Sequence, residues 1–424
     1  MKAHVESYGC AANRAYGTSI EDTLCAGGFQ LSESSEAADL VVVNTCTVKG
    51  QTKARMVERI RELLRAGKRV VVTGCMTTAQ RGLAASLVNA ENVVPLEEFR
   101  SSFGGHAVNT HEGLSTSLPP LPSKPMGRRA LIPVARGCLG SCSYCIVRLA
   151  VGPLRSHRVA ALISHVKRMI DAGAGEIYLT SQDLATFGHD NGETLPSLLE
   201  DISRLPGNFR VRLGMMTPNR AAPVFDDLLA VLDGDRRFYR FLHLPVQSGD
   251  DTVLRLMGRG YCSSDFLSLV GKARHRIPTL NVTTDVIVGF PFESTEAFQN
   301  TMSLIEEALP NKVNISRFTP RPHTVASLLP RTDRRVIEER SREASGKCRE
   351  VTGLANQRLV GERIEVIPHR GSEGGYMGRA ANFLPVRIKT NRPLEVHSPD
   401  SGTHRDCHAI GAHSISLTGY FPHT

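Results

Sequence analysis

Short β-type runs alternate with a helix-type stretch along the first hundred residues. Apolar and β-branched residues gather at 4–9 (HVESYG), 39–45 (DLVVVNT) and 69–74 (RVVVTG). Between the last two runs, residues 49–68 (KGQTKARMVERIRELLRAGK) carry apolar side chains at helical spacing. This alternation predicts a parallel α/β sheet, because parallel strands need a crossover between them.

A second series of strands is expected after a linker. Residues 115–129 (STSLPPLPSKPMGRR) are rich in proline and serine and predict an extended segment. Six β-type runs follow, separated by amphipathic stretches such as 159–175; they lie at 130–137, 176–183, 209–216, 241–249, 280–291 and 312–318. We expect a partial (β/α)6 barrel, since the roughly 225 residues available fall short of the about 250 of a full eight-stranded barrel.

The tail has a different character. Runs at 359–370, 376–390 and 413–421 are β-rich, divided by glycine, proline and serine, and show little helical periodicity. They predict a small antiparallel, OB-like β-barrel. The expected fold class is therefore α/β with an all-β end, in three domains at residues 1–120, 128–355 and 356–424.

Composition narrows the class of protein. The 424 residues exceed the roughly 250–300 at which a single core stops growing. No apolar run approaches the about 20 residues of a membrane helix, and the first residues lack a signal-type segment, so we expect a cytoplasmic protein without membrane association. The net charge of +9 favours a polyanionic partner such as RNA or DNA.

The stretch RGCLGSCSYC, at 136–145, holds three cysteines in a CxxxCxxC spacing. Cys138, Cys142 and Cys145 have no fourth cysteine nearby. A closed structural site normally uses four protein ligands, so three ligands leave one metal position open for chemistry. Structural zinc is the alternative, but it usually takes two CxxC-like pairs, and the sequence holds no second pair.

A second group of three cysteines follows the predicted strands of the first domain. Cys10, Cys46 and Cys75 each come directly after one of the three β-type runs. Ligands of open α/β sheets bind at the carboxyl ends of the strands, so these cysteines are expected to converge there. The alternative is that each is an ordinary buried cysteine at a strand end.

These motifs resemble those of a known enzyme class. A CxxxCxxC loop after the first barrel strand resembles the radical S-adenosylmethionine enzymes. The resemblance implies that an open iron binds the cofactor's amino and carboxylate groups, and that one-electron reduction cleaves the cofactor to a 5′-deoxyadenosyl radical. With the upstream cysteines, TSQD (180–183), HLPVQSG (243–249), LRLMGRGY (254–261) and DVIVGFP (285–291), the chain resembles the methylthiotransferases.

Methylthiotransferases insert sulfur and then a methyl group at an unactivated carbon, with a second cluster as the sulfur site. The resemblance therefore implies two [4Fe–4S] clusters, one on each cysteine triad, and S-adenosylmethionine. It also implies cofactor contacts, although ring packing or a plain glycine turn would explain some of these residues equally well. The implied contacts are Tyr144 against the adenine, Gly173, Gly175 and Glu176 (GAGE) at a strand start, and Gln247, Ser248 and Asp285 at strand ends.

One position departs from the family pattern. The family usually reads GFPGE where this chain has GFPFE, with Phe292 in place of a glycine. The change raises the question of how the following Glu293 is presented.

The tail resembles the TRAM module, an RNA-binding barrel. Aromatic and cationic residues there could stack on bases and follow phosphates, although a small barrel also needs aromatic residues in its core. The candidates are Tyr376, Arg379, Phe383, Arg387 and Lys389. The expected partner is the anticodon stem-loop of tRNA.

The expected substrate rests on two further stretches. NTCTVKGQTKARM (44–56) and IVRLAVGPLRSH (146–157) look most like the archaeal and eukaryotic branch that acts on threonylcarbamoyladenosine in tRNA. Arg148, Arg155 and Arg158 fit a carboxylate-bearing base, and fit other branches too. Those branches act on isopentenyladenosine or on an aspartate of a ribosomal protein.

The most distant alternative is an iron–sulfur electron carrier without catalysis. For the enzyme we expect a monomer supplied with electrons by a ferredoxin- or flavodoxin-like donor, while the sulfur donor stays open.

Overall fold

The structure, a computed structural model, describes residues 1–48, 50–104, 118–372, 375–389, 405–412 and 417–420. The chain forms two compact units, Met1–Leu198 with Thr319–Ser327, and Leu199–Phe318 with Leu328–Thr424. The first unit is therefore discontinuous in sequence. The three predicted domains at 1–120, 128–355 and 356–424 were drawn from composition and sequence motifs, whereas the two units are defined by compactness. The domain boundaries therefore stay a prediction.

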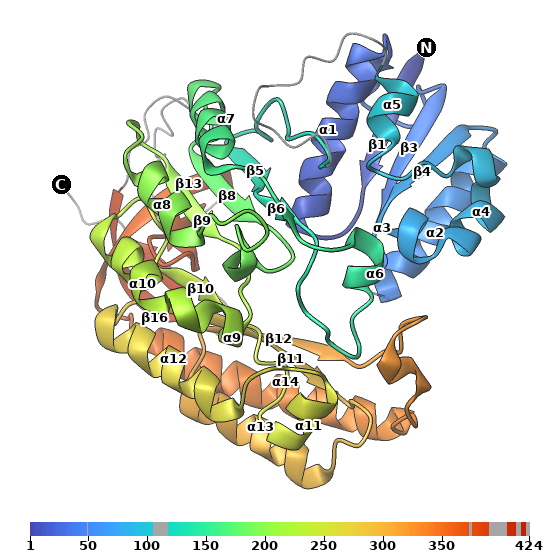
Figure 1. The fold of residues 1–424 in the computed structure, drawn as a ribbon. Helices are drawn as coiled ribbons and strands as arrows, with labels where there is room; N and C mark the ends of the chain where they lie inside the picture. The colour runs from blue at the N-terminus through green and yellow to red at the C-terminus, as the bar shows by residue number, and fades with distance from the viewer. Residues whose placement is uncertain (49, 105–117, 373–374, 390–404, 413–416, 421–424) are drawn as a thin grey trace. The chain divides into compact units, whose positions relative to one another are not determined.

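The first unit begins with a four-stranded parallel sheet (Figure 1). Its order is β2-β1-β3-β4, formed by β1 (Lys2–Ser7), β2 (Gln30–Leu31), β3 (Leu40–Thr45) and β4 (Arg69–Gly74). The predicted parallel α/β sheet is confirmed, and its three predicted strands form within two residues of their expected bounds. Strand β2 was missed because two residues carry no alternation.

Helices cover both faces of this sheet (Figure 1). On one face lie α1 (Ala11–Ala26) and α5 (Phe99–Phe103), and on the other α2 (Gly50–Arg65) and α4 (Arg81–Val88). Strand β3 is buried along its whole length. This double cover explains why its sequence is a continuous apolar run rather than an alternating one.

The rest of the first unit carries the CxxxCxxC loop. Of the predicted linker at 115–129, residues 115–117 lie outside the described residues, 118–128 form no helix or strand, and Arg129 begins β5. Ser123 is held by Asp22 through bonds of 2.8 and 2.6 Å. Strands β5 (Arg129–Pro133) and β8 (Glu176–Thr180) pair in parallel, joined by α7 (Val159–Asp171). Between them, β6 (Ala135–Arg136) and β7 (Arg155–Ser156) pair antiparallel and enclose the loop and α6 (Val147–Val151).

The second unit continues the strand–helix alternation. Strands β10 (Phe241–His243), β11 (Asn281–Val288) and β12 (Lys312–Arg317) form a parallel sheet, and β9 (Arg210–Leu213) precedes them. All six strands expected after the linker are present. The accompanying helices are α8 (Leu195–Ser203), which spans the boundary of the units, α9 (Pro218–Ala221), α10 (Phe225–Gly234), α11 (Asp251–Leu256), α12 (Ser263–Arg276), α13 (Thr295–Ala308) and α14 (Arg334–Gln357). None of the described helices is long and apolar enough to cross a bilayer.

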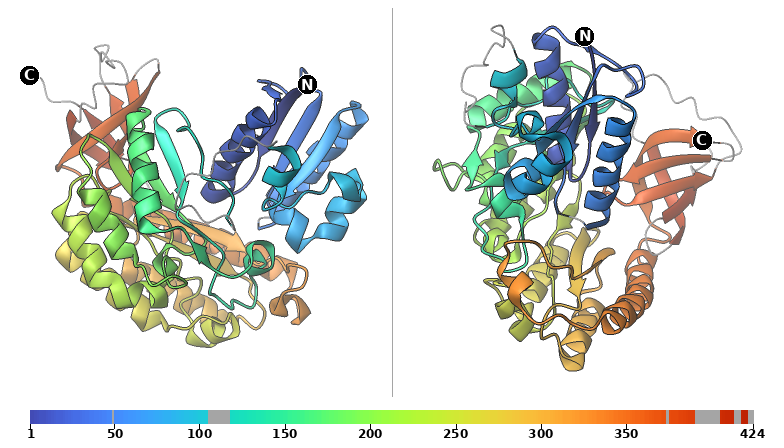
Figure 2. Two further views of the ribbon diagram at one scale, coloured as in Figure 1. Left: turned by 45° about the horizontal axis from the view of Figure 1, so that its top comes forward. Right: turned by 90° about the vertical axis from the view of Figure 1, so that its right-hand side faces the viewer.

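Helix α14 leads into a closed five-stranded barrel (Figure 2). The strands are β13 (Arg363–Ser372), β14 (Gly375–Ala380), β15 (Pro385–Lys389), β16 (Arg405–Ala412) and β17 (Leu417–Tyr420). All neighbours pair antiparallel except β15 and β17, which are parallel. The expected small barrel is confirmed. Strand β16 was missed. Residue 390 of the run predicted at 376–390, and residues 413–416 and 421 of the last predicted run, lie outside the described residues.

The barrel is attached to the strands of its own unit through Phe383. This residue adopts a left-handed backbone conformation, with φ of 68°. Its ring lies 4.9 Å from that of Tyr239 and 5.0 Å from that of Phe241, while the guanidinium groups of Arg379 and Arg212 lie 4.6 and 5.4 Å from its centre. Phe383 and Arg379 therefore pack within the protein.

The remaining candidates for RNA contact in the barrel are Tyr376, Arg387 and Lys389. Arg387 is exposed on β15. The side chains of Tyr376 and Lys389 lie outside the described ones. Of the three barrel candidates whose side chains are described, Arg379, Phe383 and Arg387, the exposed one is therefore Arg387.

Phe292 occupies a left-handed position that favours glycine. Its φ is 64°, and 61% of the residue is exposed. The next residue, Glu293, is buried and accepts hydrogen bonds from the Gly289 amide at 2.8 Å and from Arg340 at 2.7 Å. Burial raises the pKa of Glu293, and these two donors oppose the rise. Phe292 therefore adds an exposed aromatic ring to the surface, and the Glu293 carboxylate beside it is still hydrogen-bonded to two donors.

We predict that Phe292→Gly unfolds at a higher denaturant concentration than Phe292→Ala. Both variants lose the same exposed ring, but only glycine adopts the left-handed conformation freely, a difference of about 1 kcal/mol. Denaturation midpoints of the two apo-proteins measure it. Equal midpoints would show that the backbone here is unstrained.

Candidate active site

Three strand ends of the first unit bring their cysteines to one edge of the sheet. Cys10 stands at the N-cap of α1, Cys46 follows β3, and Cys75 is the first residue of α3 (Cys75–Ala79). Gly9 has φ of 103°, and a side-chain carbon there would lie 2.7 Å from both Cβ and Sγ of Cys46. The turn before Cys10 is therefore packed against Cys46.

The turn before Cys75 is equally close to β3. Gly74 has φ of 87°, and a Cβ on it would lie 2.5 Å from Oδ1 of Asn44 and 2.7 Å from the amide nitrogen of Thr45. Only glycine allows both the backbone conformation and the approach. The glycine before each of the two outer cysteines thus lets their turns close on the central strand.

Buried polar side chains hold this edge together. Asn13 donates from Nδ2 to the carbonyls of Tyr8, at 2.6 Å, and of Thr45, at 3.2 Å. Asn44 donates back to the carbonyl of Asn13 at 2.6 Å. The Thr45 hydroxyl accepts from the amide of Met76 at 3.1 Å. Sequence reasoning missed these residues, and the polar pair Asn44-Thr45 at the end of an apolar strand was the available signal.

The thiols of this group influence one another. Burial is the main factor that raises the pKa of Cys75, to about 12, and the neighbouring Cys10 and Cys46 raise it further. Burial likewise raises the pKa of Cys10, and Cys46 adds to the rise. The thiols of Cys10 and Cys75 therefore favour the protonated form when no cation is bound. Thiolates are the ligands of metals, so metal binding here would release protons.

The CxxxCxxC loop is held at its base by backbone contacts. Gly137, with φ of 103°, donates its amide to Oε1 of Gln182 at 2.9 Å, and a side chain on it would collide with the carbonyl of Pro153. The Cys138 amide donates to the carbonyl of Gly152 at 3.3 Å. Gln182 belongs to the TSQD motif, so this motif orients the loop.

Gly140 lies beside two of the loop's sulfurs. A Cβ on Gly140 would lie 3.2 Å from Sγ of Cys138 and 3.6 Å from Sγ of Cys142, and its amide donates to the Cys138 sulfur at 3.2 Å. Two of the loop's sulfurs therefore lie close to Gly140, where a side chain would crowd them. Cys145 is linked to the loop through its amide, which donates to the carbonyl of Cys142 at 3.1 Å, and Tyr144 between them is half-buried.

The two cysteine groups are neighbours in the first unit. An apolar cluster joins Ala79 of α3 to Ile146, Ala150 and Val151 at and within α6, and Cys75 packs against it. Helix α3 starts at Cys75, and α6 begins two residues after Cys145. Each helix therefore carries one cysteine group to a shared apolar contact.

A buried arginine reinforces this connection. Arg136, two residues before Cys138, has a side chain only 1% exposed and forms an ion pair with Glu97 at 2.9 Å. Its guanidinium lies 5.6 Å from the ring centre of Tyr16 on α1, and its charge lowers the pKa of Cys75 against the larger effect of burial. In the sequence, only its place beside the motif distinguishes Arg136 from other arginines.

The GAGE residues do not join the cysteine loop. Gly173 follows α7 at φ of 88°, and Gly175 and Glu176 stand where β8 begins. Cys138 follows the opposite, carboxyl end of the paired strand β5. Glu176 is buried and pairs with Arg129 at 3.0 Å. These three residues therefore lie at the end of the sheet away from the cysteine loop. The residue that contacts the loop, through the amide of Gly137, is Gln182.

The second unit brings together another predicted group. The Gln247 amide donates to the carbonyl of Asp285 at 2.8 Å, and the Asp285 carboxylate lies 3.0 Å from Nε2 of His243 and accepts from Asn314 at 2.7 Å. Gln247 and Asp285 are thus adjacent, with two polar partners that sequence reasoning missed. The Ser248 hydroxyl is buried and lies 3.2 Å from that of Thr301.

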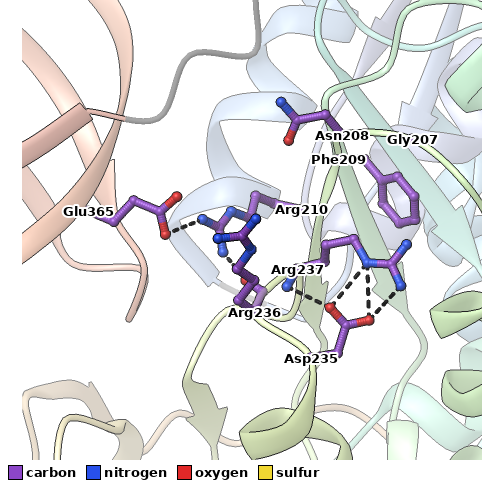
Figure 3. Close-up of a pocket in the computed structure, with 8 residues that line it drawn as sticks. All are labelled: Gly207, Asn208, Phe209, Arg210, Asp235, Arg236, Arg237 and Glu365. Carbon is purple, nitrogen blue, oxygen red and sulfur yellow. Dashed lines mark hydrogen bonds and ion pairs between the residues drawn. The ribbon is translucent and has the colours of Figure 1, made fainter.

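A hollow of about 560 Å³ in the second unit is lined by three arginines, of which Arg210 and Arg237 form ion pairs (Figure 3). Arg210 pairs with Glu365 of β13 at 2.5 Å. Arg237 is held by Asp235 through its backbone amide and its guanidinium. These ion pairs fix the barrel and the turn before β10.

Two matched regions and a set of relatives place the chain in a family. Residues 2–94 match the family model described as "Uncharacterized protein family UPF0004", and residues 132–305 match the radical SAM superfamily. A protein of Pyrococcus horikoshii named probable threonylcarbamoyladenosine tRNA methylthiotransferase is 36% identical over 406 residues, 93% of this chain and 95% of the relative. A human protein named threonylcarbamoyladenosine tRNA methylthiotransferase is 30% identical, over 95% of this chain and 73% of the relative.

The chain belongs to the threonylcarbamoyladenosine tRNA methylthiotransferase family. Among solved structures it is similar to TsrM of Kitasatospora setae, a radical S-adenosylmethionine methyltransferase, with a TM-score of 0.54 and 14% identity over 88% of this chain and 79% of that one. It is also similar to the cobalamin-dependent radical enzyme OxsB, with a TM-score of 0.52 and 8% identity over 82% and 56%. These likenesses confirm the predicted radical SAM fold.

Radical SAM membership implies an iron–sulfur cluster and S-adenosylmethionine. The sulfurs of Cys138 and Cys142 both lie beside Gly140, and cysteine thiolates are the ligands that hold iron–sulfur clusters. No group of three His, Cys, Asp or Glu side chains in the described part of the chain is placed to hold a metal ion as it stands. The ligand assignments therefore stay predictions for this family member.

We predict that Gly9→Ala impairs iron uptake by the N-terminal cysteine group. The new carbon meets Cys46 at 2.7 Å in a left-handed turn, so the Cys10 turn must move away. Gly28→Ala is the matched control, because Gly28 has φ of 84° and open space around it. Both variants bear about 1–2 kcal/mol of backbone strain, but only Gly9→Ala should lose about half of the iron after anaerobic reconstitution. Equal iron in both would remove the proposed role of this contact.

Proposed function

We propose that the protein converts N6-threonylcarbamoyladenosine beside the tRNA anticodon to its 2-methylthio derivative. The observation that carries the proposal is the pair of three-cysteine groups in one unit, joined through the packing of α3 on α6. Relatives 30–36% identical over most of the chain bear the name of this activity. The reaction replaces a hydrogen on an aromatic carbon with sulfur, which suits radical chemistry better than acid–base catalysis.

In this proposal each cysteine group holds one cluster, and the two clusters have different roles. Cys138, Cys142 and Cys145 hold the cluster at which S-adenosylmethionine binds, and Gly137 and Gln182 fix the base of that loop. When bound, the cofactor supplies the 5′-deoxyadenosyl radical and the methyl group. Cys10, Cys46 and Cys75 hold a second cluster, which makes two in all.

The position of each predicted cofactor-binding residue in the structure decides whether it remains a candidate. Tyr144, Gln247 and Asp285 remain candidates, because Tyr144 is half-buried in the cluster loop and the other two are adjacent at strand ends. Ser248 is engaged with Thr301 and is a weaker one. Gly173, Gly175 and Glu176 lie at the start of β8 and are not retained.

The partner is tRNA, contacted at its anticodon stem-loop. A hollow of about 540 Å³ in the first unit has Lys53, Arg81 and His323 among its lining residues and no carboxylate there. Such a surface suits phosphates. A cytoplasmic monomer reduced by a ferredoxin- or flavodoxin-like donor completes the proposal, and the sulfur donor stays open.

Two other functions compete with this one. Isopentenyladenosine in tRNA or an aspartate of a ribosomal protein would be a different substrate for the same chemistry. A non-catalytic electron carrier would need neither the open loop of three cysteines nor S-adenosylmethionine.

We predict that each cysteine group binds one [4Fe–4S] cluster. Replacing Cys138, Cys142 and Cys145 together with alanine should halve the iron of reconstituted protein and abolish formation of 5′-deoxyadenosine. Replacing Cys10, Cys46 and Cys75 should also halve the iron but leave cofactor cleavage detectable. Iron analysis and chromatography of the nucleoside measure the two results. Full iron content in the second triple variant would refute the N-terminal cluster.

We predict that the reduced enzyme adds a methylthio group to tRNA bearing threonylcarbamoyladenosine. Purified protein is given this tRNA, tRNA bearing isopentenyladenosine, and ribosomal protein in parallel, and mass spectrometry detects the added methylthio mass. Product on only the first substrate is expected. If product forms only on one of the other two substrates, the substrate assignment is wrong but the proposed methylthio transfer stands. If the enzyme does not cleave the cofactor at all, the electron carrier is favoured.

A further inference from the structure

A short segment far along the sequence completes the first unit. Thr319–Ser327 follows β12 of the second unit but belongs to the compact unit that holds both cysteine groups. The amide of Ala326 donates to the carbonyl of Ser143 at 2.8 Å, two residues before Cys145. The amide and hydroxyl of Thr324 donate to the carbonyl of Arg321, at 3.2 and 2.7 Å. The segment is thus a closed turn fixed to the CxxxCxxC loop.

Arg321 extends from this turn toward the N-terminal cysteines. Its Nη1 and Nη2 atoms lie 3.4 and 3.8 Å from where a Cβ of Gly50 would stand, and Gly50 begins α2 four residues after Cys46. The thiols of Cys46 and Cys145, one from each cysteine group, are near enough to raise the pKa of Arg321 against the larger effect of burial. Together with the bond of the turn to Ser143 and the place of the guanidinium beside Gly50, this puts Arg321 between the two cysteine groups.

The charge of Arg321 is not balanced by an acidic side chain. Within the described residues it takes part in no ion pair, and burial lowers its pKa. Taking a guanidinium partly out of water costs free energy that a paired anion would offset. An arginine in this state is suited to receive an anion from outside the protein.

The other arginines near the loop are engaged or turned to solvent. Arg136 and Arg155 lie 2.9 and 3.7 Å from Glu97. Arg158 donates to the carbonyl of Asn191 at 3.1 Å, and Arg148 is exposed on α6. The sequence pointed to Arg148, Arg155 and Arg158 for a carboxylate, but, unlike them, Arg321 is half-buried and without an ion pair among the described residues.

We propose that Arg321 binds the carboxylate of the substrate's threonylcarbamoyl group and so selects this base; the proposal rests on the proposed function. The target carbon must be reached both from the cofactor side and from the sulfur side. A residue between the two cysteine groups is therefore near the base. The threonyl carboxylate is the anionic group that separates this base from isopentenyladenosine, and a guanidinium can bind it through two parallel hydrogen bonds.

The surroundings of Arg321 fit an RNA that enters from the same side. The next residues, Pro322 and His323, line the basic hollow together with Lys53 and Arg81. Phosphates of the loop could lie in that hollow while the base reaches Arg321. A different use of the same cation would be to offset the charge of the thiolates, and the test separates the two uses.

The test changes the carboxylate and the arginine separately. Anticodon stem-loop RNA bearing threonylcarbamoyladenosine, and the same RNA with that carboxylate as its methyl ester, are titrated against reconstituted enzyme. Wild type should bind the acid about 10- to 100-fold more tightly than the ester, as expected for a charged hydrogen-bonded pair. Arg321→Gln should bind the two RNAs equally, with its affinity for the ester unchanged.

Arg148→Gln is the matched control, since it removes a positive charge from the helix that follows the same loop. It should keep the preference for the acid. Iron content and cofactor cleavage without RNA should be unchanged in Arg321→Gln, which shows that the clusters are intact.

Each other outcome has a defined meaning. An Arg321→Gln enzyme that still prefers the acid overturns the inference. So does an equal loss for acid and ester, which would assign Arg321 to the RNA backbone or to the clusters. If wild type forms product without distinguishing acid from ester, the inference fails and the proposed function stands. If wild type forms no product from the acid, the proposed function itself fails.

Discussion

The close approach of three turns at the carboxyl end of one small sheet is the constraint on which the candidate site depends. Gly9 and Gly74 stand immediately before Cys10 and Cys75, both in left-handed conformations, and both press against the end of β3 where no side chain fits. Cysteines separated by dozens of residues become neighbours only because the backbones can come this close. The hydrogen bonds of Asn13 to two of these strand ends then fix the distance.

Glycines also allow close packing of the backbone in the CxxxCxxC loop. Gly137 and Gly140 are placed where a side chain would meet the Pro153 carbonyl or the sulfurs. A small apolar contact, Ala79 with Ile146 and Ala150, joins this loop's helix to the helix that starts at Cys75. The distance between the two cysteine groups is therefore set by packing of α3 on α6 and by the Arg136–Glu97 pair.

Much of this arrangement could be predicted from the sequence. The parallel sheet, the six later strands and the closing barrel follow from periodicity, because most of their strands lie in distinct apolar or alternating runs. The six cysteines stood out through spacing and position alone. Strand β2 and strand β16 were missed because neither has a run long enough, or regular enough, to show a period.

The finer site residues were harder to predict because their roles depend on tertiary contacts. GAGE looked like a cofactor motif, yet it begins β8, and Glu176 is used in an ion pair with Arg129. Phe383 looked like a stacking residue for RNA, yet its ring is enclosed by Tyr239 and Phe241. Arg321 drew no attention, because nothing local shows that a segment 176 residues beyond Cys145 returns to the cysteine loops.

That return has a consequence for biogenesis. Leu198 closes the continuous part of the first unit, and Thr319 is made 121 residues later. At a synthesis rate of about 5–20 residues per second, the interval is roughly 6 to 24 s. During this time all six cysteines have left the ribosome while the turn that carries Arg321 does not yet exist. Cluster assembly on the nascent chain would therefore meet an open site without its guanidinium, and the turn would close over the cysteine loops as a late step of folding.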